Sequence, residues 1–513
     1  MTTSDAYLVF SRFGLGARPG DLMAISSAPK AALLAEIDDP TSLFLANSDL
    51  PSTADAFTQV REFQRARDLQ RKQADAAAGL APTGSDMMAG GAKTTAPVAA
   101  VPAAKIAMGA DAMGGGMGVM GGMAAPPATS KPIKPGPDAY QTITPNPSTM
   151  MDAEIAARID RALAAPIGFG ERLVAFWTNH FAVQTAADEV VRGLAGAFER
   201  EAIRPYVLGN FGDMALAATQ HPAMLMSLNN ATSIGPNSPQ GLKSGKGLNE
   251  NHARELMELH TVGVDAGYTQ ADVTSFAKVL TGWTFGRGEN EPEIYGRFVF
   301  RNYAHEPGPQ TVMGKVYPQD GVDQGLAVIA DLAKSPATAK HVATQLATYF
   351  VADNPDPALV KRLADTFHKS GGNLKTVTLA LINSPEAWAA PAEKLRTPQE
   401  FLWSAVRALK LDIKPGVVNR TLADLGQPLW NPPSPQGFKD DAATWLAPDA
   451  MTTRVDVAEL LASQDKTLGD PVQLASDVLG DKMSSDTKTA VERAESRGQA
   501  VALLLMSPEF QRR

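Results

Sequence analysis

The sequence predicts a mainly α-helical protein, with a multi-helical globular core, one short β-hairpin and a disordered insertion rich in Gly, Met, Ala and Pro. Three observations carry this prediction. Apolar residues recur three and four positions apart through most of the 513 residues, as on the buried face of an amphipathic helix. Strand-like character is confined to one stretch. One long segment has a composition that cannot form a packed core.

The first two segments differ sharply in composition. Residues 1–78 are predicted to be a helical region, because Leu33, Leu34 and Ile37 recur at helix spacing. Residues 79–147 are predicted to be a flexible low-complexity insertion around "MGADAMGGGMGVMGGMAAPP". Its methionines could bind soft Cu(I) through their thioethers, but a loose apolar surface, or no function, is the simpler interpretation.

The helical core with the candidate site is predicted over residues 148–410. "MDAEIAARIDRAL", "GFGERLVAFWTNHFAV" and "NENHARELMELHTVG" each have helical periodicity. "GRFVFRN" and the following "QTVMGKVYP" are typical of strands, and we expect them to form the hairpin. Residues 411–513 begin with a Pro-rich loop, "PLWNPPSPQGF", and continue as helices that we expect to pack on the core.

Composition excludes several classes of function. Hydrophobic residues make up 44% and charged residues 20%, as in soluble globular proteins. The net charge of −8 and the lack of a dense Lys/Arg run argue against a nucleic-acid partner. With no cysteine, disulfides, thiolate nucleophiles and Cys-ligated metals are excluded. No apolar run is long enough for membrane insertion, and no apolar signal-peptide core stands near residue 1, so we expect a cytoplasmic location.

One segment concentrates polar side chains. Residues 249–260, "NENHARELMELH", hold eight polar or ionisable residues in twelve. On a helix, His252 and Glu255 lie about 60° apart, and Arg254 and Glu258 have the spacing of an ion pair. This pattern suits a carboxylate and imidazoles that face a cleft and bind a metal or exchange protons. The alternative is an exposed, salt-bridged helix, and spacing alone favours it.

Two further clusters carry candidate side chains. "FWTNHF" places Asn179 and His180 among aromatic residues, where a histidine is more often part of the core than a ligand. His305 in "HEPGP" follows a predicted strand, on a loop where functional side chains are common. The Walker, Rossmann, Gly-x-Ser-x-Gly and His-Glu-x-x-His signatures are absent from the sequence, which lowers the weight of the common reaction classes.

The motifs "FWTNHF", "FEREAIRPYVLGNF", "HPAMLMSLNN", "NENHARELMELHTVGVDAGYTQADV", "LTGWTF", "HEPGPQTVMG" and "LLLMSPEF" occur in this order. The chain thereby resembles the bacterial family catalogued as domain of unknown function 1800, from "FGLGARPGD" to the C-terminus. The resemblance implies that the following belong to the family pattern: Trp177, Asn179, His180, Asn249, Glu250, Asn251, Arg254, Glu255, Glu258, His260, Trp283 and His305. His252 departs from it, because Tyr is expected there, and this weakens any mechanism that needs His252.

The resemblance also implies a partner. Members are often encoded beside a second family that carries a twin-arginine export signal. A chain without its own signal would then be exported with that partner and reach the periplasm, which is the alternative to the cytoplasm.

Our hypothesis is a metal-assisted, hydrolase-like enzyme with a polar cleft. Catalysis is assigned to His180, Arg254, Glu255 and His260. Binding of a divalent metal is assigned to His180, Glu255, His260 and His305. Substrate binding is assigned to Trp177, Asn179, Arg200, Asn249, Asn251 and Trp283. The alternative is a non-catalytic binding or assembly protein that acts with an exported partner, its polar cluster being a structural network. Convergence of these side chains on one cleft would distinguish the two.

Overall fold

The structure is a computed structural model that describes residues 3–46, 49–77, 143–245, 247–288, 290–389, 392–465 and 469–513. Most of the predicted insertion, 79–142, lies outside the described residues. The chain divides into two compact units, Met1–Arg61 with Pro145–Arg513, and Glu62–Thr144. The sites described below all belong to the first unit.

The N-terminal segment is helical, as predicted. It contains α1 (Ser4–Leu8), a π-helical turn η1 (Val9–Phe13), α2 (Asp21–Ile25), α3 (Pro29–Asp38), the 3₁₀ turn η2 (Pro40–Leu43) and α4 (Thr53–Ala77). A buried carboxylate ties this segment to the core, because Glu36 accepts hydrogen bonds from the backbone N–H groups of Ile167, Gly168 and Phe169. These N–H groups stand at the start of a helix, where a carboxylate is electrostatically favoured.

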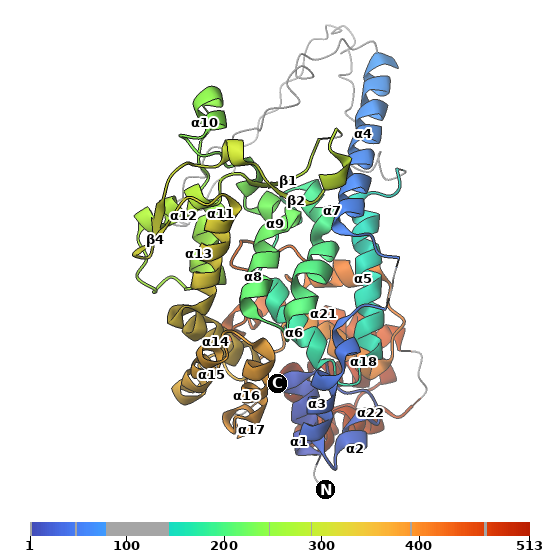
Figure 1. The fold of residues 1–513 in the computed structure, drawn as a ribbon. Coiled ribbons are helices and arrows are strands. Elements are labelled where there is room, and N and C mark those ends of the chain that lie inside the picture. Colours follow the sequence, from blue (N-terminus) through green and yellow to red (C-terminus); the bar gives the residue numbers. More distant parts are fainter. Residues whose placement is uncertain are drawn as a thin grey trace, which may run out of the picture. The chain divides into compact units, whose positions relative to one another are not determined.

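The central helices are α5 (Pro147–Ala164), α6 (Phe169–His180), α7 (Glu189–Phe198), α8 (Phe211–Gln220), α9 (Pro222–Ser227), α10 (Pro239–Ser244), α11 (Asn251–Glu255) and α12 (Gln270–Val279). α5 packs on α7, and α7 packs on α9 (Figure 1). Local signals set their starts: Asn146 forms a capping box with Thr149, and Pro147 occupies the first helical position. These helices confirm the predicted periodicity.

Two π-helical turns interrupt the central helices within the family motifs. η5 (Glu199–Ile203) follows α7, and η8 (Leu256–His260) follows α11. Short 3₁₀ turns occur at η6 (Arg204–Tyr206), η7 (Asn230–Thr232), η9 (Pro292–Ile294) and η10 (Asn302–Ala304). Because a π turn adds one residue to the helical repeat, the residues of "LMELH" rotate away from the positions that a regular helix gives them.

The strand pairing differs from the expected hairpin. β2 (Phe298–Phe300) pairs antiparallel with β1 (Trp283–Phe285), and β3 (Gln310–Val312) pairs with β4 (Lys315–Tyr317). "QTVMGKVYP" is therefore a hairpin by itself. Met313 and Gly314 both have positive φ, 49° and 78°, as a two-residue type I′ turn requires.

The remaining helices continue to the C-terminus. They are α13 (Val322–Lys334), α14 (Pro336–Phe350), α15 (Pro357–Lys369), α16 (Leu374–Asn383), α17 (Glu386–Ala389), α18 (Pro398–Leu409), α19 (Pro415–Asp424), α20 (Ala442–Trp445), α21 (Pro448–Gln464), α22 (Pro471–Leu479), the 3₁₀ turn η11 (Gly480–Lys482), α23 (Ser485–Glu492), α24 (Arg497–Met506) and α25 (Pro508–Gln511). α14, α15 and α16 lie side by side (Figure 1).

One cluster of buried apolar side chains runs through this unit, from Ala6 to Phe510. Residues on both sides of position 410 contribute to it, so the C-terminal helices share a core with the central ones. The boundaries between the three helical regions stay a prediction. Within the described ranges, no helix has both the length and the apolar character needed to span a bilayer.

Candidate functional site

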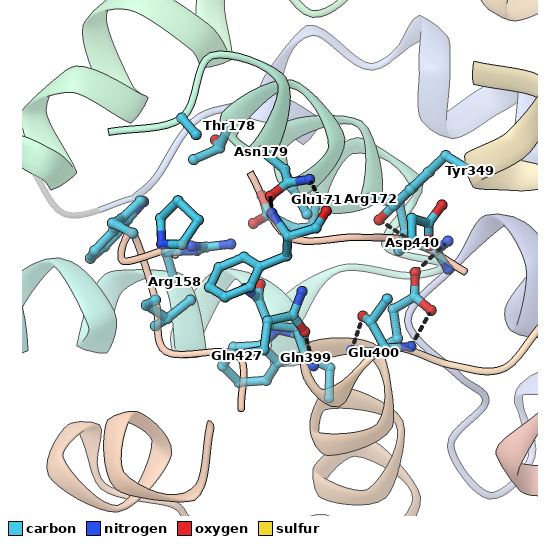
Figure 2. A pocket seen from close by; sticks show the side chains of 18 of the residues that line it. Arg158, Glu171, Arg172, Thr178, Asn179, Tyr349, Gln399, Glu400, Gln427 and Asp440 are labelled. Carbon is cyan, nitrogen blue, oxygen red and sulfur yellow. Dashed lines mark hydrogen bonds and ion pairs between the residues drawn. The ribbon is translucent and has the colours of Figure 1, made fainter. Parts of the chain in front are cut away.

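A charged pocket lies among α5, α6, α18 and the segment between α19 and α20 (Figure 2). Its cavity volume, taken as the space open to the centre of a water molecule, is about 60 Å³. At roughly 10–15 Å³ for each water, this is room for about four to six water molecules or one compact ligand. The polar side chains around it are Arg158, Glu171, Arg172, Thr178, Asn179, Tyr349, Thr397, Gln399, Glu400, Gln427, Lys439 and Asp440.

A network of buried ion pairs includes Arg158 and Glu171 of the pocket wall and holds them in place. Arg204 lies 2.6 Å from Glu171 and 2.8 Å from Glu199, and Arg158 lies 3.2 Å from Glu199. All four side chains are at most 5% exposed. Because a buried charge without a partner is strongly destabilising, this network fixes α5, α6 and η5 relative to one another.

Glu400 occupies the wall opposite Asn179 (Figure 2). Its position follows from a capping box at the start of α18, in which Glu400 accepts a hydrogen bond from the Thr397 N–H at 3.0 Å. Arg172 and Arg513 pair with the carboxylate at 2.8 Å and 2.6 Å. Burial alone would raise the pKa of Glu400, but the two guanidinium groups lower it below its ordinary value.

Asp440 lies beside Arg172 and Tyr349 in the same pocket (Figure 2). The nearest cations to its carboxylate are Lys394 at 3.2 Å and Arg513 at 3.5 Å, and neither carboxylate oxygen has a hydrogen bond from a described residue. Burial raises the pKa of Asp440 to about 7, against the opposing effect of the two cations and with a further contribution from Glu400. Asp440 can therefore exchange a proton near neutral pH while Glu400 stays ionised.

Trp430 fixes the segment that closes the pocket. Its indole Nε1 donates to Glu199 at 3.0 Å, and the Arg158 guanidinium stands 5.4 Å from the ring centroid. Its φ of 51° is rare for an aromatic residue, so surrounding contacts must hold this conformation.

Asn179 binds the same segment from α6. Its amide donates to the Phe438 carbonyl at 2.9 Å, and its Oδ1 accepts from the Phe438 N–H at 2.7 Å. Gly437 comes so close that a Cβ on it would stand 2.5 Å from the Asn179 carbonyl. Asn179 is the one predicted site residue that lines the pocket.

Two predicted ligands, His180 and His260, are brought together in the core, with ring centroids 5.8 Å apart. His341 lies 6.3 Å from His180, and Trp177 packs at 5.2 Å from it. His180 Nδ1 is 2.8 Å from Gln345, and its Nε2 is 3.1 Å from the His260 carbonyl. Burial lowers the pKa of His180 to about 4 and that of His260 well below its usual value, so both imidazoles are neutral at pH 7.

His252 also faces this cluster and contributes to the lowered pKa of His260. It is 1% exposed, and neither ring nitrogen has a hydrogen-bond partner among the described residues. Burial lowers the pKa of His252 to about 3. His180, His252, His260 and His341 together form what we call the histidine cluster.

The other two predicted ligands lie elsewhere. Glu255 is half-buried on α11 beside Arg254 and Glu258, and burial together with Glu258 raises its pKa. His305 packs on Phe300, and its Nδ1 is 3.0 Å from the Thr281 carbonyl, which identifies Nδ1 as the protonated nitrogen. In the part of the chain that the structure describes, no three His, Asp or Glu side chains are grouped so that they could hold a metal ion.

The remaining polar residues of "NENHARELMELH" contact one another along the helix, and Glu250 also contacts α12. Arg254 pairs with Glu250 at 3.1 Å and with Glu258 at 3.5 Å, and Glu250 accepts from Thr274 at 2.6 Å. Asn249 accepts from the N–H of Asn251 at 2.9 Å, at the start of α11. The salt bridges of the alternative interpretation are present, but the helix is not exposed as that interpretation expected, because His252 and His260 are buried.

Two predicted substrate-binding residues have structural contacts outside the pocket. Arg200 pairs with Glu154 at 2.9 Å. Trp283 is fully buried, and its ring lies 5.2 Å from that of Phe298. Neither residue lines the charged pocket.

Sequence reasoning missed most of the pocket. Glu171 and Arg172 interrupt an apolar helical run, "GFGERLVAFW", and two charges on such a face are a signal of buried pairing. Glu400 stands where a helix-capping residue is expected, so its sequence position did not indicate a further role. Asp440 lies in a loop, where no periodic pattern predicts its contacts. Their shared pocket depends on contacts across more than 200 positions of sequence, such as that between Arg172 and Glu400.

Comparison with known proteins adds a family and no activity. A family model described as "Protein of unknown function (DUF1800)" matches residues 8–512, nearly the whole chain. No curated protein and no solved structure matches the chain.

Proposed function

Because the chain belongs to the family described as "Protein of unknown function (DUF1800)", whose description assigns no activity, we propose its function from the pocket. We propose a hydrolase-like enzyme that acts on a small, uncharged polar substrate by exchanging protons through Asp440. The observation that carries this proposal is the Asp440 carboxylate at the pocket wall, which forms ion pairs with Lys394 and Arg513 but accepts no hydrogen bond from the described residues.

The charge of the pocket supports an uncharged substrate. Its ionisable lining balances three cations against three anions, namely Arg158, Arg172 and Lys439 against Glu171, Glu400 and Asp440. The amides of Gln399 and Gln427 and the rings of Trp403 and Trp430 offer hydrogen bonds and apolar contact. Esters, amides and glycosides of small neutral molecules fit this combination.

The chemistry assigned to Asp440 is general acid–base catalysis. In its protonated form the carboxyl donates a proton to the leaving group, and in its ionised form it accepts one from the attacking water. Burial raises the pKa of Asp440, and Glu400, held ionised by two arginines, adds to this rise. No step of this scheme requires a metal ion.

A metal-assisted hydrolase would instead need its ligands in one place. His180 and His260 adjoin each other, whereas Glu255 and His305 contact other residues. This arrangement favours the carboxyl pocket over the histidine cluster as the site of the proposed chemistry.

The test compares wild-type protein with Asp440→Asn on uncharged esters, amides and glycosides. The expected result is hydrolysis of one class by the wild type and a fall in kcat of about 100- to 10,000-fold in the variant, the usual range for a lost acid–base group. Asp412→Asn is the matched control, because the Asp412 side chain is 88% exposed. Undiminished activity of Asp440→Asn, or no hydrolysis by the folded wild type, contradicts the proposal.

A second candidate is a non-catalytic binding or assembly protein. Its support is the structural use of Glu250 and Arg254, which pair with each other, while Glu250 also accepts a hydrogen bond from Thr274 of the neighbouring helix α12. The twin-arginine-exported partner rests on the family resemblance alone. If export with that partner is correct, replacing the arginine pair of its signal with lysines should move this chain from the periplasmic to the cytoplasmic fraction.

A further inference from the structure

A second cavity lies on the other side of the segment that closes the pocket. This outer groove has a cavity volume of about 820 Å³, and its lining includes Gln184, Pro432, Phe438, Lys439 and Trp445. Pro432, Phe438 and Lys439 line both cavities. A thin wall of chain therefore separates a small charged pocket from a larger, mostly apolar groove.

The first part of this wall is held firmly. The Trp430 carbonyl accepts from the Thr185 N–H at 3.1 Å. Asn431 accepts from the Ala186 N–H at 2.9 Å, and the Pro432 carbonyl accepts from Gln184 at 3.2 Å. With the indole of Trp430 also bonded, residues 430–432 have several independent attachments.

The end of the wall is held as well. The Lys439 carbonyl accepts from the Trp445 indole at 3.1 Å. Lys394 donates to the Asp440 carbonyl and lies 3.2 Å from its carboxylate. Residues 439–440 are thus fixed on the side of α20.

Between these anchors, residues 433–438 have one side-chain attachment among the described residues: the Asn179 amide donates to the Phe438 carbonyl and accepts from the Phe438 N–H. Gly437 precedes Phe438 with a φ of 81°, a conformation that glycine adopts without strain. The backbone can therefore turn at Gly437 once the Asn179 bonds break, and the Phe438 side chain would leave the wall.

We propose that Phe438 is a gate between the charged pocket and the outer groove, and that Asn179 is the positioning residue that holds this gate shut. That the gate admits substrate rests on the proposed function of the pocket. The gate itself depends only on the contacts above. An uncharged, partly apolar substrate suits this route, because Lys439 is the one ionisable residue that lines the groove.

Hydrogen exchange of the intact protein tests the latch without any ligand. Asn179→Ala should speed amide exchange in peptides covering residues 433–440 by about 10- to 100-fold, since two hydrogen bonds hold the segment. Gln184→Ala is the matched control, because it removes one bond at Pro432 and leaves the other attachments of residues 430–432 in place. Exchange there should stay within about twofold of the wild type.

A second variant tests the gate independently of the latch. Phe438→Ala should leave exchange in residues 433–440 within about threefold of the wild type, because the Asn179 bonds go to backbone atoms. It should increase acrylamide quenching of tryptophan fluorescence, because Trp403 and Trp430 line the pocket behind the gate. Asn179→Ala should increase both readouts, and Gln184→Ala neither.

Two results would overturn the gate: equal exchange in Asn179→Ala and wild type, or quenching in Phe438→Ala no greater than in wild type. These outcomes are separate from the test of Asp440. If the gate opens as expected while Asp440→Asn keeps full activity, the pocket is accessible but its proposed chemistry is wrong.

Discussion

Single ionisable residues in enclosed or half-buried positions determine how this molecule responds to pH. The imidazoles of the histidine cluster are neutral and face one another, and the groups that influence their pKa values are other histidines and hydrogen-bonding groups, with no carboxylate among them. Asp440 is the opposite case, a carboxyl whose pKa burial raises to about 7. The two kinds of group give pH dependences of opposite sign.

The histidine cluster should make the protein sensitive to mild acid. Below pH about 6.5 the unfolded chain binds protons that the buried imidazoles do not, so the free energy of unfolding falls with pH. With folded pKa values of about 3 for His252 and about 4 for His180, each histidine should cost about 2 kcal/mol at pH 5. Asp440 opposes this loss, since its stabilising effect grows as pH falls below about 7.

Comparing variants isolates the histidine effect. His252→Phe should reduce the loss of unfolding free energy between pH 7 and pH 5 by about 2 kcal/mol. Urea denaturation at the two pH values measures this loss. His368→Phe, at an exposed position of α15, should keep the wild-type slope. The same slope in all three proteins would show that His252 is not held neutral in the folded state.

For single residues, the sequence indicated which side chains are important better than it indicated which residues they contact. "FWTNHF" and "NENHARELMELH" indicated His180, His260 and Asn179; the two histidines are buried, and Asn179 forms two hydrogen bonds with Phe438. Composition and spacing could not show that His180 meets His341, because 161 positions separate them in the chain and the contact forms only when α6 and α14 pack together.

Helices and their junctions set the geometry of the pocket. Periodicity predicted the central helices because an amphipathic face leaves a repeat of 3.6 residues in the sequence. Periodicity could not predict the π turn of η8, since that turn depends on how α11 packs. It also could not predict that β1 pairs with β2, because the paired residues, such as Thr284 and Val299, are 15 positions apart in the sequence. The turn at Met313–Gly314 was a local signal for β3–β4 that the expected longer hairpin overlooked.

Close helix packing gives a prediction at this scale. A Cβ on Gly196 of α7 would stand 2.1 Å from the Glu154 side chain of α5, which pairs with Arg200. Gly196→Ala should therefore lower the free energy of unfolding by about 1–3 kcal/mol, the usual cost of overpacking. Thermal and urea denaturation measure this change.

Gly498 of α24 provides a control of opposite sign. A Cβ there meets no atom within 4 Å. Gly498→Ala should raise the stability by about 0.4–1 kcal/mol through the unfolded chain. Equal and small effects of the two substitutions would mean that α5 and α7 are not in close contact.

For the whole molecule, charge placement connects distant parts of the chain to one pocket. Arg172 of α6, Glu400 of α18 and Asp440 of the loop before α20 form a continuous chain of ion pairs with Arg513 and Lys394. The mainly helical fold followed from pattern and composition. The site did not, because it is built from contacts between segments that no local pattern relates.

This arrangement leads to a prediction about metal content. Protein purified without chelator or affinity metal should contain far less than one equivalent of any divalent metal by elemental analysis, since the four predicted ligands do not share a site. The same result is expected for His260→Phe. Near-stoichiometric metal in the wild type, lost in a folded His260→Phe variant, would restore the metal-assisted mechanism.

The measurement that tests the central claim most directly is an infrared pH titration of carboxyl groups in the folded protein. The account predicts a pocket carboxyl that gains its proton near pH 7, present in the wild type and in Asp412→Asn and absent from Asp440→Asn. A wild-type protein with no carboxyl titrating between about pH 6 and pH 8, or a signal that persists in Asp440→Asn, would contradict the assignment of Asp440 as the proton-exchanging group.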